Sequence, residues 1–235
     1  DTIYLDVVST KKNGWMQDST GWWYRNADGT YPVNQWQLID NKWYHFDRNG
    51  YMQTGWLRVV NTWYYLNTDG SMVMDWQTIE GSKYYFMPSG AMSVGWRSID
   101  GTYYYFVPSG AMATGWVQSG ASWYYMDLTT GSMVTGFADI GGTTYYMTAS
   151  GAMATDWFRI GDKWYYAISS GAVVKRTWVG NYYLDKDGMM VTYAYVKNGA
   201  KYYWVNSSGV YTQTYTEKDT VGYTIYDQTT GTKMD

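Results

Sequence analysis

A glycine returns along this chain at nearly constant spacing. The same aromatic phrase surrounds most of these glycines, and it is clearest between Gly95 and Trp116, as GWRSIDGTYYYFVPSGAMATGW. A unit of about 20 residues cannot bury its own apolar face, so its neighbours must stack against it. The spacing therefore predicts a tandem array rather than a single globular core. The eleven glycines, at steps of 17 to 22 residues, are Gly29, Gly50, Gly70, Gly90, Gly110, Gly131, Gly151, Gly171, Gly188, Gly209 and Gly231.

The composition limits which side chains can form the core and which partners the chain can bind. The chain has 15 Trp, 28 Tyr and 5 Phe among 235 residues, so we expect rings rather than aliphatic side chains to form the core. The net charge is -3 without a basic run, which argues against a nucleic-acid partner. No apolar stretch approaches the roughly 20 residues that span a bilayer, so we expect a soluble segment without membrane insertion. Cysteine is absent, which excludes disulfides and thiolate metal sites.

Each unit carries the signals of a β-hairpin. Short alternating runs rich in Trp and Tyr, such as 123–126, are typical of strands. Asp100-Gly101, Glu80-Gly81 and Asn198-Gly199 are dipeptides that favour tight hairpin turns. The sequence thus predicts an all-β chain of hairpins, each followed by a glycine-bearing link. We expect repeats over 14–235 with a degenerate cap at 212–235, and a linker or lead-in strand at 1–13. Regular stacking is expected to falter at the 17-residue step between Gly171 and Gly188.

Two aligned positions behave differently from unit to unit. The first column is aromatic in every unit: Trp15, Trp36, Trp56, Trp76, Trp96, Trp116, Phe137, Trp157, Trp178, Tyr195 and Tyr215. The second column lies seven residues later in the regular units: Trp22, Trp43, Trp63, Lys83, Tyr103, Trp123, Thr144 and Trp164, and then, as the register slips, Asn181, Lys201 and Tyr223. A position that fills a stack should stay apolar, whereas one that lines a ligand pocket can lose its ring where no pocket is needed. The second column therefore indicates binding.

The neighbouring positions complete the pattern. The residue after the second column is nearly always Tyr, and it points to the opposite face of the strand, toward a different groove. Two residues past most link glycines stands a Met, which we expect to fill gaps and to reach a ligand. The recurrent Met residues are Met52, Met72, Met92, Met112, Met133, Met153 and Met190.

Catalysis finds little support in the sequence. His45 is the only histidine, and it stands where most units have Tyr, so we interpret it as a packing residue. Without cysteine and with serines concentrated in links, no nucleophile and base pair suggests itself. Several Asp residues fall at turns, where backbone geometry favours them. We predict a binding module without catalytic residues, metal or cofactor.

The segments TGWLRVVNTWYYLNTDGSM (54–72) and TGWVQSGASWYYMDLTTGSM (114–133) resemble the choline-binding, or cell-wall-binding, repeats of Gram-positive surface proteins. Glucan-binding repeats are similar. The resemblance implies a β-solenoid, here of about eleven stacked hairpins, with a ligand cage at each junction. A cage takes two rings from one repeat and a tyrosine from the next, and ring faces hold a quaternary ammonium by cation-π contacts. On this sequence the implied aromatic sets are Trp15, Trp22 and Tyr44; Trp36, Trp43 and Tyr64; Trp56, Trp63 and Tyr84; Trp96, Tyr103 and Tyr124; Trp116, Trp123 and Tyr145; and Trp157, Trp164 and Tyr182.

Three functions stay open at this stage. The first is a secreted attachment module on the bacterial cell surface that binds choline on teichoic or lipoteichoic acid. The second is a carbohydrate-binding solenoid of an adhesin, glucansucrase or toxin, with α-glucan or a host glycan as ligand. The third is an inert stalk. The units that begin at Trp76, Phe137, Trp178 and Tyr195 lack the second ring, so we expect binding at only a subset of junctions.

Overall fold

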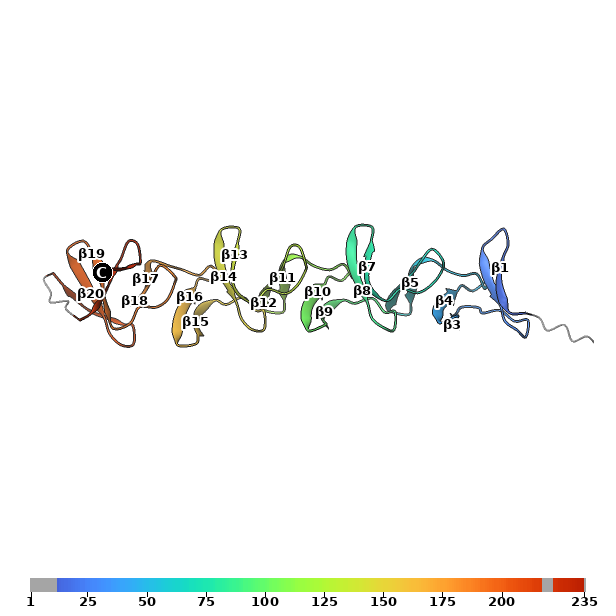
Figure 1. Ribbon diagram of the computed structural model, residues 1–235, viewed down its shortest axis with the longest axis horizontal. Helices are drawn as coiled ribbons and strands as arrows, with labels where there is room; N and C mark the ends of the chain where they lie inside the picture. Colours follow the sequence, from blue (N-terminus) through green and yellow to red (C-terminus); the bar gives the residue numbers. More distant parts are fainter. Residues whose placement is uncertain (1–11, 217–221, 235) are drawn as a thin grey trace, which may run out of the picture. The chain divides into compact units, whose positions relative to one another are not determined.

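The computed structural model describes residues 12–216 and 222–234, and its regular secondary structure there is β-strand (Figure 1). The chain divides into two compact units, Asp1–Ala113 and Thr114–Asp235, and each is described by itself. Within the described residues, no helix is long and apolar enough to cross a membrane. The predictions of an all-β class and of repeated hairpins are confirmed.

The described part of the first unit consists of five antiparallel hairpins, each a two-stranded sheet of its own (Figure 1). The two residues before the first hairpin, Lys12 and Asn13, form no strand but hydrogen-bond to Arg25 and Tyr24. The rest of the segment predicted to be a linker or lead-in strand lies outside the described residues. The hairpins pair β1 (Gly14–Gln17) with β2 (Trp22–Arg25), β3 (Gln35–Ile39) with β4 (Lys42–Phe46), β5 (Gly55–Val59) with β6 (Thr62–Leu66), β7 (Asp75–Ile79) with β8 (Ser82–Phe86), and β9 (Gly95–Ile99) with β10 (Thr102–Phe106).

The second unit begins with four further hairpins: β11 (Gly115–Ser119) with β12 (Ser122–Met126), β13 (Gly136–Ile140) with β14 (Thr143–Met147), β15 (Asp156–Ile160) with β16 (Lys163–Ala167), and β17 (Thr177–Val179) with β18 (Tyr182–Leu184). It ends in a five-stranded sheet of order β21-β20-β19-β22-β23. Those strands are β19 (Ala194–Asn198), β20 (Lys201–Val205), β21 (Tyr211–Tyr215), β22 (Thr224–Asp227) and β23 (Lys233–Met234). Because β22 pairs in parallel with β19, the described residues of the last expected repeat add strands to the preceding hairpin instead of forming a hairpin of their own.

Most predicted hairpin turns are confirmed by the backbone. Asp100 and Gly101 have φ of 50° and 79°, and Glu80 and Gly81 have 50° and 80°, which is the pair of positive values that a type I′ turn requires. The prediction of a turn at Asn198-Gly199 is wrong by one residue. Asn198 pairs with Lys201, so the turn residues are Gly199 and Ala200.

The recurrent link glycine has a packing reason as well as a backbone one. Gly90 has a φ of +79°, and a Cβ atom there would stand 2.2 Å from the Sδ atom of Met72, in the preceding link. Only a residue without a side chain leaves room for that methionine. This explains why the glycine and the methionine recur together. The same contact joins Met52 to Gly70, Met92 to Gly110, Met133 to Gly151, Met153 to Gly171, and Met190 to Gly209.

Within each compact unit, a backbone hydrogen bond ties most links to the hairpin before their own. The Met92 amide donates to the carbonyl oxygen of Trp63 at 2.8 Å, and the corresponding bonds recur along both units. They continue through the shortened repeat, where Met190 N donates to Trp164 O at 2.8 Å and Tyr211 N to Asn181 O at 2.7 Å. The strands β17 and β18 shrink to three residues each. The expected faltering at the 17-residue step is therefore limited to strand length and does not break the link bonds.

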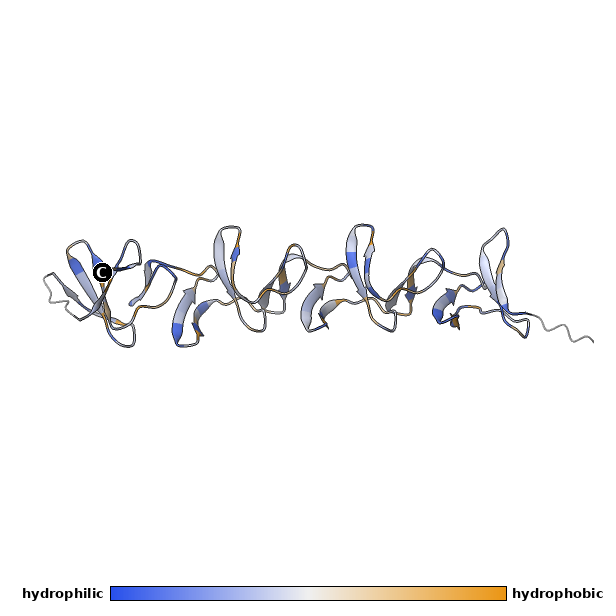
Figure 2. Cartoon of the chain, in the orientation of Figure 1, coloured by the Kyte–Doolittle hydropathy of each residue, from blue (hydrophilic) through white to orange (hydrophobic). Residues whose placement is uncertain are grey.

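In every described hairpin except the first, the last residue of the second strand is among the most deeply buried. Three of the nine side chains at this position are rings and six are not, so the expectation that rings rather than aliphatic side chains form the core is only partly correct here. The link crosses at this position, as in the bridge between Phe86 and Met92, and encloses the side chain whatever its type. Figure 2 shows few strongly hydrophobic stretches, because the hydropathy scale ranks Trp and Tyr near neutral. The nine side chains, each no more than 1% exposed, are Phe46, Leu66, Phe86, Phe106, Met126, Met147, Ala167, Leu184 and Val205.

Candidate functional site

Strand register places the two columns on one face of each hairpin. In β5 and β6, Trp56 pairs with Tyr65 and Arg58 pairs with Trp63, so both tryptophans face one side and Tyr64 faces the other. The rings of Trp56 and Trp63 meet edge to face, with centroids 6.2 Å apart and planes at 89°. The prediction that the second column and the tyrosine after it face opposite grooves is confirmed by this register.

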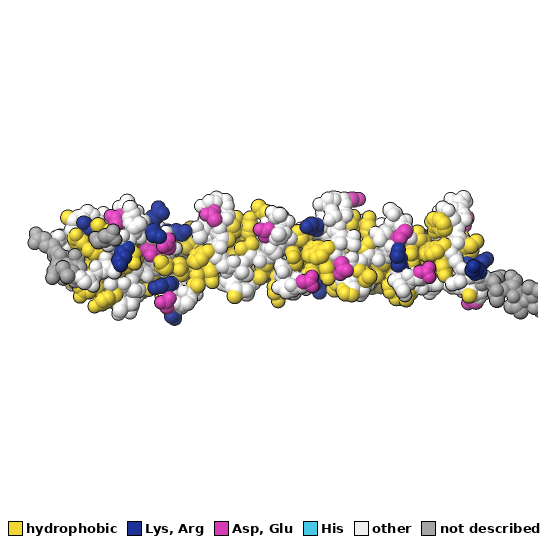
Figure 3. Space-filling view, in the orientation of Figure 1, with side chains coloured by type: hydrophobic (Ala, Val, Ile, Leu, Met, Phe, Trp, Pro, Cys, Tyr) yellow, Lys and Arg dark blue, Asp and Glu magenta, His cyan; other side chains and the backbone are white. Residues whose placement is uncertain are grey.

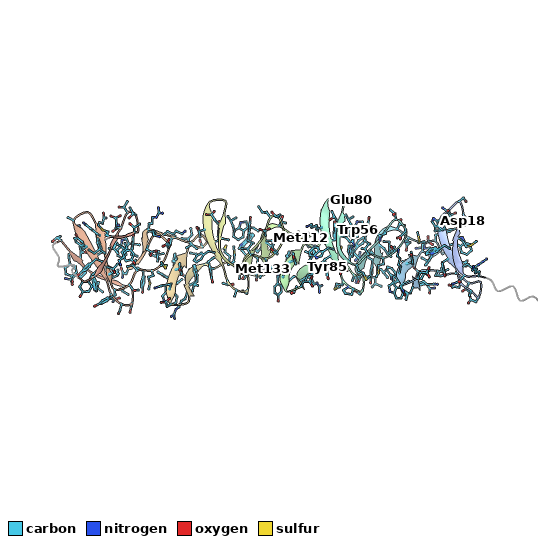
Figure 4. All side chains as sticks on the ribbon, viewed as in Figure 1. Asp18, Trp56, Glu80, Tyr85, Met112 and Met133 are labelled. Atoms are coloured by element: carbon cyan, nitrogen blue, oxygen red, sulfur yellow. The ribbon has the colours of Figure 1, made fainter. Side chains whose placement is uncertain are left out.

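The next hairpin supplies the third ring. The centroids of Trp56 and Tyr84 lie 5.0 Å apart, so Trp56, labelled in Figure 4, contacts rings of both hairpins. The first-column ring and the tyrosine of the next hairpin are likewise in contact in four other sets. Their centroid distances are 4.8 Å for Trp15 and Tyr44, 5.0 Å for Trp36 and Tyr64, 4.9 Å for Trp116 and Tyr145, and 5.0 Å for Trp157 and Tyr182.

Three of these sets line a cavity that is open to solvent. Trp36, Trp43 and Tyr64 line a cavity of about 250 Å³ together with Met72, Pro88 and Ser89. Trp116, Trp123 and Tyr145 line one of about 310 Å³ with Met153, Ser169 and Ser170. Trp157, Trp164 and Tyr182 line one of about 270 Å³ with Met190 and Ser208. None of these three linings contains a charged side chain, so the walls are ring faces, thioethers and small polar groups.

The second-column tryptophans stay open to solvent. Large apolar rings are usually buried, and a surface that repeats them is typical of an interaction site. Figure 3 shows hydrophobic side chains over much of the visible face, with charged side chains in small groups among them. The exposed fractions are 43% for Trp22, 43% for Trp43, 40% for Trp63, 41% for Trp123 and 39% for Trp164.

The remaining predicted set is divided between the two units. Trp96 lies in β9 and Tyr103 in β10, where register places both on one face, and Tyr103 is 50% exposed. Tyr124 lies in β12 of the second unit. This set stays a prediction.

Two hairpins with a polar residue in the second column keep the contact between the first-column ring and the tyrosine of the next hairpin. Trp76 and Tyr104 lie 4.9 Å apart although Lys83 replaces the second ring. Phe137 and Tyr165 lie 5.3 Å apart beside Thr144. The Thr144 hydroxyl accepts a hydrogen bond from Lys175 Nζ at 3.1 Å, so a cationic group of the chain reaches the place where a ring would stand.

The assignment of Lys201 to the second column is wrong. Register pairs Tyr195 with Trp204 and Lys197 with Tyr202, so Tyr202 holds that place, with its ring 6.3 Å from Tyr195. The slip arises because the turn lies one residue later than the Asn-Gly dipeptide suggests. The tenth repeat therefore has a second ring. Its first ring, Tyr195, is only 3% exposed. Its ring is covered by Tyr215 and Tyr223, both 5.8 Å away.

Sequence reasoning missed the link serines. Ser89, Ser170 and Ser208 each precede a link glycine that lies two repeats beyond the tryptophans whose cavity they line. Their recurrence before glycine is visible in the sequence, but serine is also an ordinary turn residue, and only the fold shows which cavity each reaches. The methionines that line the three cavities were expected at that place.

Two tyrosine phenols near the rings are neutral at physiological pH. Burial is the main cause of the raised pKa values of Tyr44 and Tyr165, so both phenols keep their protons. His45 is buried, its ring centroid is 4.9 Å from that of Trp36, and its Nδ1 lies 2.5 Å from Gln53 Oε1, as expected of a packing residue. Among the described residues, no group of three or more His, Cys, Asp or Glu is placed to hold a metal.

Repeated hairpins with ring-lined cavities at their junctions define a class of repeat protein. The model of the choline-binding repeat matches residues 33–75, 93–136 and 134–178, and a second choline-binding repeat model matches 172–211. A putative cell wall binding repeat matches residues 75–92. These matches cover more than half of the chain, which therefore belongs to the choline-binding repeat family of Gram-positive cell-wall-binding proteins.

Solved structures agree with this family. Choline binding protein F of Streptococcus pneumoniae matches with a TM-score of 0.68 and 36% identity, over 72% of this chain and 61% of that one. A structure of the same protein in the presence of a peptidoglycan analogue matches with a TM-score of 0.63 and 34% identity, over 82% of this chain and 61% of that one. The modular autolysin LytC of Streptococcus pneumoniae matches with a TM-score of 0.63 and 25% identity, over 85% of this chain and 46% of that one.

A lysin of Pneumococcus phage Dp-1 is 50% identical over 42 residues, which are 17% of this chain and 14% of the lysin. The chain thus spans less than two thirds of the length of each of these relatives.

Proposed function

We propose that this chain is a non-catalytic β-solenoid of about eleven repeats that attaches a secreted protein to the Gram-positive cell surface. Its ligand is choline carried on teichoic or lipoteichoic acid, held in cages formed by the aromatic sets. The observation that carries the proposal is the lining of the three cavities, in which three rings and a methionine meet without any charged group. A quaternary ammonium donates no N–H bond, and ring faces attract it with roughly 0.5 to 2 kcal/mol per contact.

Repetition compensates for weak individual sites. Several cages that engage one choline-bearing polymer raise the effective concentration of the next choline, so avidity exceeds the affinity of any one cage. Junctions with Lys83 or Thr144 in the second column take no choline in this proposal, because they lack the second ring. A lysine ammonium also repels a cationic ligand.

Isothermal titration calorimetry with choline chloride and, separately, with dextran tests the proposal. We expect saturable choline binding with several sites per chain. The Trp123→Ala variant should lose one site, or weaken it by about 2- to 30-fold, the equivalent of one ring contact. Thr144→Ala is the matched control, since it changes the same column in the next hairpin and should leave the choline stoichiometry unchanged. A response to dextran without any response to choline would contradict the proposal.

A second candidate is carbohydrate binding, as in a glucan-binding adhesin, glucansucrase or toxin. The link serines favour it, because Ser89, Ser170 and Ser208 bring hydroxyl groups to the cavities. A hydroxyl can donate to and accept from a sugar, whereas a quaternary ammonium has no N–H group with which to hydrogen-bond it. Replacing Ser89 by Ala separates the two functions: choline affinity should persist, whereas glucan affinity should fall.

A further inference from the structure

A fourth cavity lies at the first hairpin, outside the predicted aromatic sets. It measures about 180 Å³ and is lined by Asp18, Trp23, Tyr31, Asn49, Gly50 and Tyr51. Trp23 pairs with Met16, whereas Trp15 pairs with Tyr24, so Trp23 faces away from the set that contains Trp15 and Trp22. The cavity is therefore separate from that set.

Part of this cavity repeats the wall of the other three. Trp23 holds the strand position of Tyr64, and Tyr31 stands two residues past a link glycine, as Met72 does. The Tyr31 ring packs on Gly50 in the way Met72 packs on Gly90, since a Cβ atom at Gly50 would stand 2.7 Å from the Tyr31 Cδ2 atom. The rings of Trp23 and Tyr31 meet edge to face, with centroids 6.0 Å apart.

The rest of the lining is different in kind, because a carboxylate stands there. Asp18, labelled beside β1 in Figure 4, lies in the loop between β1 and β2. Its Oδ1 accepts the amides of Thr20 at 2.8 Å and Gly21 at 3.2 Å, and its Oδ2 accepts the Tyr51 hydroxyl at 3.1 Å. The three bonds fix the carboxylate at the cavity wall.

The carboxylate carries a full negative charge. The Thr20 amide, followed by the Gly21 amide and the Tyr51 hydroxyl, holds the pKa of Asp18 below its usual value. In the part of the chain that the structure describes, no lysine or arginine forms an ion pair with it. Ring faces are also electron-rich, so the cavity attracts a cation.

An ionised carboxylate favours a cation that can donate a hydrogen bond, because a charge-assisted N–H bond is about twice as strong as a neutral one. A quaternary ammonium cannot make that bond, whereas a primary ammonium offers three donors. We propose that the cavity of Asp18, Trp23, Tyr31 and Asn49 binds a primary ammonium, in an amino alcohol or an amino sugar, in preference to choline. The chain then carries two kinds of ammonium site with different selectivity.

Fluorine NMR on the full chain labelled with 5-fluorotryptophan tests this site directly. The 15 tryptophans give separate reporters, and Trp23→Phe identifies the resonance of Trp23. We expect ethanolammonium or protonated glucosamine to shift that resonance saturably, at concentrations at least tenfold below those of choline. A shift by ethanolammonium alone assigns the amino alcohol, and a shift by glucosamine assigns the amino sugar. N-acetylglucosamine, which lacks the charge, should leave the resonance unchanged.

Two variants separate binding from folding. Asp18→Asn keeps an acceptor oxygen for the loop amides but removes the charge, so the response to ethanolammonium should weaken at least tenfold while the Trp43 and Trp123 resonances keep their positions. Asp127→Asn is the matched control, because Asp127 accepts the loop amides of Thr129 and Thr130 in the same pattern but does not line this cavity, so binding should persist. Equal responses of Trp23 to choline and ethanolammonium, or an undiminished response in Asp18→Asn, would overturn the proposal. Choline-dependent shifts at Trp43 and Trp123 report separately on the proposed choline function.

Discussion

The Sδ atom of Met72 lies so close to Gly90 that a Cβ atom there would stand only 2.2 Å away. Gly90 also has a φ of +79°. Gly81, in the turn of the neighbouring hairpin, has a φ of +80°, but a Cβ atom at that position would meet no other atom within 4 Å. The two glycines therefore separate the backbone requirement from the packing requirement.

Gly90→Ala should destabilise the chain more than Gly81→Ala. Both place an L residue in the left-handed region, at about 1 to 2 kcal/mol, but only Gly90→Ala also displaces Met72, which adds about 1 to 3 kcal/mol of overpacking. Urea unfolding followed by tryptophan fluorescence measures the difference. The double variant Gly90→Ala with Met72→Ala should recover part of the excess. Equal losses in the two single variants would show that the methionine contact is unimportant.

Val60→Gly should stabilise the chain by about 1 kcal/mol, since it relieves a β-branched residue held in the left-handed region. Val60 has a φ of 56° and is 87% exposed, so its side chain contributes little packing. Thermal unfolding should show a higher midpoint for the variant. The reciprocal change Gly161→Val is the control: Gly161 has a φ of +59° and no atom within 4 Å of a Cβ, so it should lower the midpoint.

Asp185→Asn should raise stability at neutral pH. Burial is the main cause of the raised pKa of this carboxyl, against the two amide bonds from Met189 and Asp187. The folded state then holds the proton more tightly than the unfolded state, so stability falls as the pH rises from 3.8 through the folded pKa. Asparagine can accept the same amides without a charge, as Asn206 does from Ser208 and Val210.

The gain in the thermal midpoint should therefore be largest at pH 7 and vanish below pH 3.8, where the native carboxyl is protonated in both states. Asp47→Asn is the control, because Asp47 accepts amides in the same pattern but is only half-buried. A gain that does not change with pH would refute the electrostatic cause.

Lys83→Trp should create an additional choline site, if the proposed function holds. Trp76 and Tyr104 already lie 4.9 Å apart there, against 5.0 Å for Trp56 and Tyr84. Calorimetry should find one more choline bound per chain. Lys83→Ala removes the charge without adding a ring and should leave the stoichiometry as it is.

Much of the fold was predictable because each unit repeats the same local signals. Period-two aromatic runs and Gly-containing turns predicted the hairpins, and the register of Trp56, Trp63 and Tyr64 followed from strand alternation. The C-terminal sheet was not predictable. The parallel pairing of Ala194 with Thr224 joins residues far apart in the sequence, and no local pattern encodes such a contact.

The two columns could be identified from spacing, and the resemblance to choline-binding repeats implied how their rings combine into sets. The full lining of the cavities could not be predicted, because Ser89 reaches its cavity from two repeats away. The Lys201 error has a physical origin too: Asn-Gly usually marks the two central turn residues, but here Asn198 pairs within the ladder. The cavity of Asp18 was missed because turn aspartates have a sufficient backbone explanation.

The hydrogen bond between a link and the hairpin before its own is accepted by a main-chain oxygen. The carbonyl groups of Trp63, Lys83 and Thr144 accept it equally, at 2.8 Å in each case. These backbone bonds therefore do not depend on the side chain at the position that decides whether a proposed cage is complete. If the proposed function holds, a single codon change can add or delete one choline site without a compensating change elsewhere. Avidity for a choline-bearing polymer can then evolve separately from the number of repeats.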